Sequence, residues 1–283
     1  MTSKETVLIT GCSDDGIGYG LAVQFQKRGY HVFATARTVE KMSKLKGLPN
    51  VMLLPLDVVE PAHIKAAVEA VTKETGGTLN YLISNAGRNH FMPILDEDLD
   101  TVRALFDVNV FGPMALTKAF APLIIKAKGS FAFVTSISGY INVPWMGTYA
   151  ATKRGIELIA ETLRLEVEPF GVNVIEIVTG AVKTLGQSYF SDYALPADSL
   201  YKSVEASVKS RAQGNDGLPR MPLEEYSVAV TDEIINRTPG KFWYGQNADL
   251  VKKSTTATAI PQSAMDAGAI MCTGLDEMAK EGE

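Results

Sequence analysis

Short apolar runs alternate with helix-length segments over the first two-thirds of the sequence. Several runs are almost continuous in Val, Ile, Leu and Phe, which is typical of strands that are covered on both faces. Strands that alternate with helices along a chain form a parallel sheet with helices packed on both faces. The sequence therefore predicts one doubly wound α/β domain over residues 1–283. The expected strands are residues 7–10, 31–35, 51–56, 79–84, 130–135, 172–178 and 241–244.

The bulk composition narrows the class of protein further. The chain has 283 residues, of which 46% are hydrophobic, and a chain of this length can bury a sizeable core. Its formal net charge of −5 gives no reason to expect a nucleic-acid partner. The two cysteines, Cys12 and Cys272, lie far apart and have no CxxC spacing. We therefore expect neither a disulfide framework nor a metal site.

The amino-terminal residues indicate where the protein resides. Residues 1–6 lead directly into the first strand, without the charged start and apolar run of a signal peptide. We count no apolar stretch of about 18 residues, the length that a helix needs to cross a bilayer. We therefore expect no transmembrane segment and, because disulfides are not indicated, a reducing cytoplasmic location.

Two parts of the chain lack a clear pattern. From about residue 185 to residue 237, Ser, Asp, Lys, Gly and Pro become frequent. This region is either a lid that binds substrate or a mobile surface excursion, and the sequence does not choose between them. Residues 255–283 are rich in Ala, Met and Thr and form a variable tail to which we assign no structure.

A glycine-rich turn follows the first strand and precedes a helix. Its characteristic residues are Gly11, Ser13, Gly16, Ile17 and Gly18. Glycines let the backbone approach a pyrophosphate, and the free N–H groups at a helix N-terminus attract an anion. An ordinary strand–helix turn is the alternative. The strand before the turn and the helix after it favour a Rossmann-type dinucleotide site.

The end of the second strand predicts which dinucleotide is bound. An acidic residue there would hydrogen-bond the ribose hydroxyls of NAD, but this strand ends in Thr35-Ala36-Arg37. Arg37 is suited to charge-assisted bonds with a 2′-phosphate, so we expect NADP(H). The alternative is that Arg37 is a solvated surface charge. Asp14 and Asp15 in the glycine turn oppose the assignment, because they add negative charge near the phosphates.

Further along the chain, several polar residues are predicted to meet at one edge of the sheet. Tyr149 and Lys153 are four residues apart, which places them on one face of a helix. Ser136 follows the fifth strand, the tripeptide 85–87 ends the fourth, and Asn109 lies in the helical stretch 98–126. Ligands bind at the carboxyl ends of the strands in such sheets. These residues are therefore the candidate active site.

The order of these motifs resembles the short-chain dehydrogenase/reductase family over about residues 5–185. The resemblance implies an NADPH-dependent oxidoreductase in which Tyr149 donates a proton to a carbonyl oxygen. Lys153 would bind the nicotinamide ribose and lower the pKa of Tyr149, Ser136 would hold the substrate oxygen, and Asn109 would support a proton relay through water. The cofactor contacts that it implies beyond the glycine turn and Arg37 are Asp57, Val58, Asn85, Ala86, Gly87, Tyr149, Lys153, Gly180, Val182 and Thr184.

The resemblance is more specific in residues 10–18, 134–139 and 178–184, which are similar to fungal 1-acyldihydroxyacetone-phosphate reductases and their relatives. It implies reduction of a small hydrophobic carbonyl substrate, either by a biosynthetic-pathway ketoreductase or by an acyldihydroxyacetone-phosphate reductase. A non-catalytic NADP-binding regulator is a further alternative, because a fold does not fix a function. Residues 255–274 contain no aromatic residue, which favours the pathway enzyme. The family also implies a homo-oligomer, a dimer or a tetramer.

Overall fold

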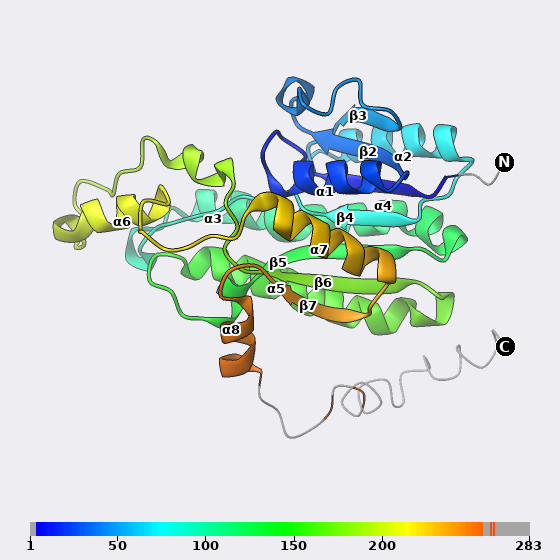
Figure 1. Cartoon of the computed structure of the whole chain (residues 1–283). Helices are drawn as coiled ribbons and strands as arrows, with labels where there is room; N and C mark the ends of the chain where they lie inside the picture. Colours follow the sequence, from blue (N-terminus) through cyan, green and yellow to red (C-terminus); the bar gives the residue numbers. More distant parts are fainter. Residues whose placement is uncertain (1–3, 257–260, 262, 264–283) are drawn as a thin grey trace.

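The structure, a computed structural model, describes residues 4–256, 261 and 263. Seven parallel strands form one sheet in the order β3-β2-β1-β4-β5-β6-β7 (Figure 1). All seven expected strands are present, so the predicted doubly wound α/β fold is confirmed. The strands are β1 (Thr6–Thr10), β2 (His31–Ala36), β3 (Val51–Pro55), β4 (Tyr81–Ser84), β5 (Ser130–Ser136), β6 (Asn173–Thr179) and β7 (Gly240–Tyr244).

Helices cover both faces of the sheet, and consecutive strand residues alternate between two cores. In β1, Val7 and Ile9 belong to the core under α1 (Ile17–Lys27) and α7 (Leu223–Asn236), whereas Leu8 points to the opposite core. That second core lies under α2 (Pro61–Thr75), α4 (Gly112–Ala127) and α5 (Gly147–Val167). Burial on both faces explains why the strands read as continuous apolar runs.

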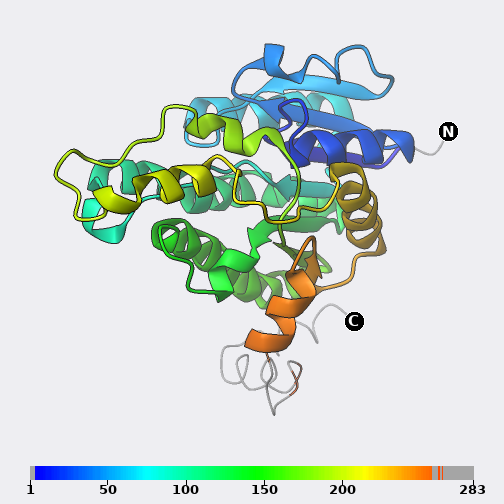
Figure 2. The same cartoon turned by 60° about the vertical axis from the view of Figure 1, so that its left-hand side comes forward.

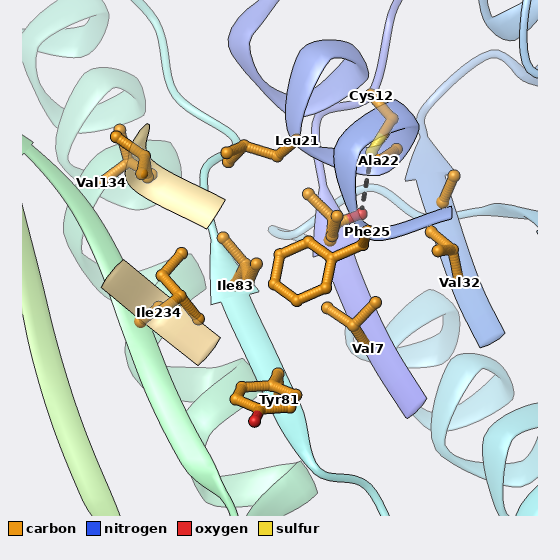
Figure 3. Close-up of a cluster of buried hydrophobic side chains, with 14 of the residues drawn as sticks. Val7, Cys12, Leu21, Ala22, Phe25, Val32, Tyr81, Ile83, Val134 and Ile234 are labelled. Atoms are coloured by element: carbon orange, nitrogen blue, oxygen red, sulfur yellow. Dashed lines mark hydrogen bonds between the residues drawn. The ribbon is translucent and has the colours of Figure 1, made fainter. Parts of the chain in front are cut away.

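Figure 3 shows part of the first core, in which Phe25 of α1 lies among Val7, Tyr81 and Ile83. The buried thiol of Cys12 donates a hydrogen bond to the carbonyl of Ile9 at 3.2 Å. Burial raises the pKa of this thiol to about 12. Cys12 is therefore a packing residue of the glycine turn and not a reactive thiol.

A long helical stretch precedes β5. It consists of α3 (Leu99–Phe106), a π-helical segment η3 (Asp107–Phe111) and α4. Residues Leu99–Ala127 are long and apolar enough to cross a membrane, with a mean hydropathy of 1.5. The sequence was expected to contain no such stretch. Leu116 and Phe120 are nevertheless fully buried in the second core. A core helix can be equally long and apolar, so this stretch is weak evidence for a span.

The loosely patterned region is shorter than the sequence analysis predicted. Residues 185–222, which we call the lid segment, contain η6 (Leu185–Phe190), η7 (Lys202–Val204) and α6 (Glu205–Ala212), and they project to one side of the layered core (Figure 2). The prediction that this region extends to residue 237 is wrong, because α7 packs on α1 with Tyr226, Val230 and Ile234 fully buried. After β7, α8 (Ala248–Thr255) packs on η4 (Ile137–Tyr140), and most of the predicted tail lies outside the described residues.

One carboxyl group is buried in the middle of strand β6. Glu176 of β6 is fully buried, and both its carboxyl oxygens lack a hydrogen-bond partner. Burial, reinforced by the nearby Glu161, raises its pKa from the usual 4.5 to about 8, although Lys241 partly offsets the shift. Glu176 is therefore protonated in the folded protein at neutral pH.

This burial predicts a pH-dependent stability. Between pH 4.5 and about 8 the folded chain retains a proton that the unfolded chain has lost, so the free energy of unfolding falls as the pH rises. Glu176→Gln keeps the shape of the side chain but does not ionise. We expect it to reduce the fall in stability between pH 5 and pH 8, by an amount on the order of a few kcal/mol. Denaturant unfolding at the two pH values measures this. Glu166→Gln, at an exposed position of α5, is the control. An unchanged pH dependence in Glu176→Gln would contradict the assignment.

Candidate active site

The glycine turn has the geometry of an anion site. Gly11 has φ +75°, and a Cβ atom there would lie 2.9 Å from the Cα of Ala86. A Cβ atom on Gly18 would lie 2.5 Å from the carbonyl oxygen of Gly11. Gly16 caps α1 without a side-chain hydrogen bond, and the first turn of α1 carries no acidic residue. The N–H groups at this helix end are therefore suited to a pyrophosphate, with Ser13 and Ile17 on either side of the cap.

The two aspartates that opposed an NADP site are held by a neighbouring loop. Asp14 accepts hydrogen bonds from the Ser43 hydroxyl at 2.6 Å and from the Lys44 N–H at 3.1 Å. Asp15 forms an ion pair with Lys44 at 2.6 Å. Ser43 and Lys44 follow η1 (Val39–Met42), which comes shortly after β2. Lys44 thus offsets the negative charge of Asp15 in the glycine turn, and Arg37 stands exposed at the end of β2.

The tripeptide after β4 is fixed against the end of β1. The Thr10 hydroxyl accepts hydrogen bonds from the N–H groups of Asn85 and Ala86, both at 3.0 Å. The Asn85 amide donates to the carbonyl oxygen of Thr10 at 2.7 Å. A Cβ atom on Gly87 would lie 3.2 Å from Asn109 Oδ1 and 3.5 Å from Lys153 Nζ. The backbone of residues 85–87 therefore lies between the glycine turn and the catalytic candidates, and the lack of a side chain on Gly87 leaves room beside Asn109 and Lys153.

Asn109 lies in the π-helical segment η3, and its buried side chain joins the β4 loop to α5. Its Oδ1 accepts a hydrogen bond from the Arg88 N–H at 2.8 Å. Its Nδ2 donates to the Arg88 carbonyl oxygen at 2.9 Å and to the Thr152 hydroxyl at 3.0 Å. These bonds use both protons of the amide and leave Oδ1 able to accept one more. The predicted water relay remains a prediction.

Ser136, Tyr149 and Lys153 meet at the carboxyl edge of the sheet. Tyr149 and Lys153 lie one turn apart on α5, and Ser136 is the last residue of β5. The Ser136 hydroxyl accepts hydrogen bonds from the N–H and the hydroxyl of Ser138, at 3.2 and 3.0 Å, and it lies close enough to Tyr149 to lower the pKa of that phenol. Lys153 Nζ lies 5.9 Å from the centroid of the Tyr149 ring and donates to the Val134 carbonyl oxygen at 3.0 Å. The spacing on which the sequence analysis relied therefore brings these three side chains together.

Burial sets the protonation of this group. It raises the pKa of Tyr149 to about 12, which the nearby Ser136 hydroxyl partly offsets, and it lowers the pKa of Lys153 to about 8. The direction for Tyr149 differs from the sequence-based expectation that Lys153 lowers it. The reason is that burial removes water from the phenolate, while the ammonium group is directed at the Val134 carbonyl. The phenol consequently holds its proton at neutral pH.

The remaining predicted cofactor contacts follow β3 and β6 at the same edge of the sheet. Asp57 and the buried Val58 follow β3 after one intervening residue. Gly180 follows β6, where a side chain would clash with the Gln246 carbonyl oxygen. Val182 is buried, and the Thr184 hydroxyl accepts a hydrogen bond from the Gly186 N–H at 3.3 Å.

Beyond these residues lies a cavity of about 730 Å³, between the loop after β6 and the lid segment. Its lining includes Lys183, Thr184 and Arg220, and Arg220 forms an ion pair with Asp216 at 2.9 Å. In the part of the chain that the structure describes, no cluster of three or more His, Cys, Asp or Glu side chains is placed to hold a metal ion.

Two aromatic pairs that the sequence did not reveal join the lid segment to segments that neighbour the catalytic candidates in the sequence. Phe91, after the β4 loop, packs edge-to-face on Phe190 of the lid segment, with ring centroids 5.4 Å apart. Trp145, shortly before α5, packs on Tyr201 at 5.1 Å. No local signal in the sequence marks these pairs, because each contact joins residues that lie far apart in the sequence.

Comparison with known proteins identifies the family of the chain. Residues 5–193 match the family model described as short chain dehydrogenase. The chain belongs to the short-chain dehydrogenase family. This confirms the resemblance, and with it an oxidoreductase.

The similar family members include a short-chain dehydrogenase of Penicillium crustosum, which is 43% identical over 87% of this chain and 90% of its own. The NADPH-dependent 1-acyldihydroxyacetone phosphate reductase of Schizosaccharomyces pombe is 35% identical over 86% of this chain and 82% of its own. Among solved structures, a short-chain dehydrogenase from Streptomyces avermitilis is similar with a TM-score of 0.77, at 24% identity over the full length of both chains. One from Burkholderia cenocepacia in complex with NADP has a TM-score of 0.72, at 23% identity over 95% of this chain and 98% of its own.

Proposed function

We propose that this short-chain dehydrogenase uses NADPH to reduce the ketone of a small hydrophobic substrate, or oxidises the matching alcohol, with Tyr149 as the proton donor. The observation that carries the proposal is the meeting of Ser136, Tyr149 and Lys153 beside a glycine turn that fits a pyrophosphate. The relative described as NADPH-dependent and the similar structure in complex with NADP support this choice of cofactor.

The residues present fit NADP(H), which would supply a hydride when bound. The glycine turn would hold the pyrophosphate, and Arg37 would bond the 2′-phosphate. Asp57 and Val58 would contact the adenine. The segments 85–87 and 180–184 would line the nicotinamide half, and Lys153 would bond the nicotinamide ribose. Lys44 would reduce the negative charge at the phosphate end of this site, because it pairs with Asp15.

The chain's own residues then perform the proton chemistry. Ser136 and Tyr149 would both donate hydrogen bonds to the substrate oxygen, where negative charge develops during reduction. Tyr149 would transfer its proton to that oxygen, and the ammonium group of Lys153 would stabilise the phenolate left behind. Asn109 and Lys153 both face Gly87, so a water molecule between them would return a proton to Tyr149.

The surroundings of the site favour a hydrophobic substrate. Phe91 and Trp145 from the body of the protein meet Phe190 and Tyr201 of the lid segment. Aromatic rings supply large apolar contact areas of defined orientation. We propose that the lid segment binds the apolar part of the substrate, and that the enzyme serves a biosynthetic pathway in the cytoplasm.

A second candidate is reduction of 1-acyldihydroxyacetone phosphate. It is favoured by the relative from Schizosaccharomyces pombe and by Lys183, an exposed cation that lines the cavity beside the lid segment. In this case Lys183 would pair with the substrate phosphate.

The first experiment measures NADPH oxidation by the purified protein, with 1-acyldihydroxyacetone phosphate in one arm and a panel of bulky hydrophobic ketones in the other. We expect turnover of the ketones, and a fall in kcat of about a hundredfold or more in Tyr149→Phe, since proton donation contributes about that much. Turnover of only the acyl phosphate, abolished by Lys183→Ala, would support the second candidate. NADPH binding without turnover of any substrate would contradict both and favour the non-catalytic regulator.

The role of Arg37 has its own test. We expect Arg37→Ala to raise the KM for NADPH about tenfold to a hundredfold and to leave the KM for NADH unchanged, because a charge-assisted bond to phosphate is worth about 1.5–3 kcal/mol. Lys46→Ala removes an exposed cation from a nearby loop and serves as the control. If both variants raise the KM equally, the effect is one of general charge and Arg37 does not select the cofactor.

The pKa values of Tyr149 and Lys153 predict the pH dependence of reduction. Lys153 is protonated below about pH 8 and loses its proton above it, whereas Tyr149 keeps its proton up to about pH 12. We therefore expect kcat/KM for reduction to be constant from pH 6 to about 8 and to fall at higher pH. Profiles of the wild type and Lys153→Met measure this, because the variant should lack the decline. A wild-type profile that is constant to pH 10 would contradict the role of the ammonium group.

A further inference from the structure

A short segment runs alongside the start of the catalytic helix α5. It comprises residues 91–97, which include η2 (Ile94–Asp96), and we call it the strap. The Met92 N–H donates to the Trp145 carbonyl oxygen at 2.7 Å. A Cβ atom on Gly147 would lie 2.9 Å from Cδ1 of Ile94. The strap therefore packs directly on the turn from which Tyr149 projects.

The last residue of the strap, Glu97, uses its two carboxylate oxygens on two different elements. One accepts a hydrogen bond from the hydroxyl of Thr148, the residue immediately before Tyr149. The other lies 2.8 Å from Nε2 of His90, in the loop that follows the tripeptide 85–87. The Glu97 side chain is only 6% exposed, and Thr148 is buried. A carboxylate this far from water requires its partners, so these contacts constrain both elements.

The residue before Glu97 connects the strap to the lid segment. Asp96 accepts a hydrogen bond from the hydroxyl of Ser199 at 2.6 Å, and that hydroxyl accepts one from the Tyr201 N–H at 3.1 Å. The Tyr201 ring in turn packs on Trp145. The strap thus lies between the lid segment and the catalytic helix and contacts both.

We propose that Glu97 is a positioning residue that holds the Tyr149 hydroxyl in register with Ser136. This inference rests on the proposed function, because it assigns Glu97 a role in the reaction of Tyr149. Its basis is geometric. Through Thr148, Glu97 holds the first turn of α5, and through His90 it holds the loop after β4. Asn109 bonds that same loop at Arg88 and the same helix at Thr152. A displacement of about 1 Å at a reacting group lowers the rate about a hundredfold.

The test removes the Glu97–Thr148 bond from either side. We expect Glu97→Ala and Thr148→Val each to lower kcat about tenfold to a hundredfold on the best ketone of the panel, with the Kd for NADPH changed less than about twofold. Thr148→Ser keeps the hydroxyl donor and should recover most of the kcat that Thr148→Val loses. Asp100→Asn removes an exposed carboxylate three residues away, paired only with Arg103, and is the charge-matched control. If Glu97→Ala does not fold, the two Thr148 variants carry the test.

The double variant distinguishes positioning from a general loss of structure. Because both changes break the same bond, Glu97→Ala/Thr148→Val should be no slower than the slower single variant, whereas independent effects would multiply. Multiplied effects, a kcat for Glu97→Ala equal to that of Asp100→Asn, or a matched loss of NADPH binding would each overturn the inference. The proposed function would stand in those cases as long as Tyr149→Phe is inactive. Absence of wild-type turnover on every substrate would instead overturn both proposals.

Discussion

Thr10 accepts hydrogen bonds from two backbone N–H groups, those of Asn85 and Ala86, at the point where the strand order of the sheet reverses. After β1 the chain proceeds outward to β2 and β3, and it returns to the other side of β1 as β4. The loops on the two sides therefore separate and open a crevice. The side chain of Thr10 holds them at a fixed distance, with Gly11 on one side and Gly87 on the other. The phosphate end and the catalytic end of the site both depend on this contact, because each begins within a few residues of it.

The burial that stabilises the fold also sets the chemistry of the site. Tyr149 and Lys153 lie on the face of α5 that packs toward the sheet, and the pKa of each is shifted toward its neutral form. A phenol that retains its proton suits reduction. An ammonium group whose pKa lies near neutral pH changes its protonation when the charge nearby changes slightly. Glu176 shows the same effect without a catalytic role, because its position in β6 places it among apolar side chains and other carboxylates.

The sequence predicted what depends on local spacing and failed where contacts join distant segments. Apolar runs located all seven strands, and the spacing of Tyr149 and Lys153 placed them on one helix turn. Helix α7 was not identified from the sequence, although Tyr226, Val230 and Ile234 recur at helical spacing. Nor did the sequence predict the hydrogen bonds to Asp14 and the ion pair of Asp15, since Ser43 and Lys44 are about thirty residues away in the sequence. Glu97 has no local signature at all, because Thr148 lies 51 residues further along the chain.

The polar contacts that the sequence did not reveal share one arrangement. Each joins a carboxylate to another segment near the carboxyl edge of the sheet: Asp14 bonds to the loop after η1, and Glu97 bonds to Thr148 in the first turn of α5 and to His90. Glu157 of α5, fully buried, accepts hydrogen bonds from Thr135 and Tyr140, which lie on either side of Ser136. Apolar packing alone does not fix the position of such segments, because it is non-directional. A buried carboxylate is directional and costly to leave unpaired, so it allows few alternative positions. The apolar cores thus determine the sheet, and these carboxylates constrain the segments that carry the candidate catalytic side chains.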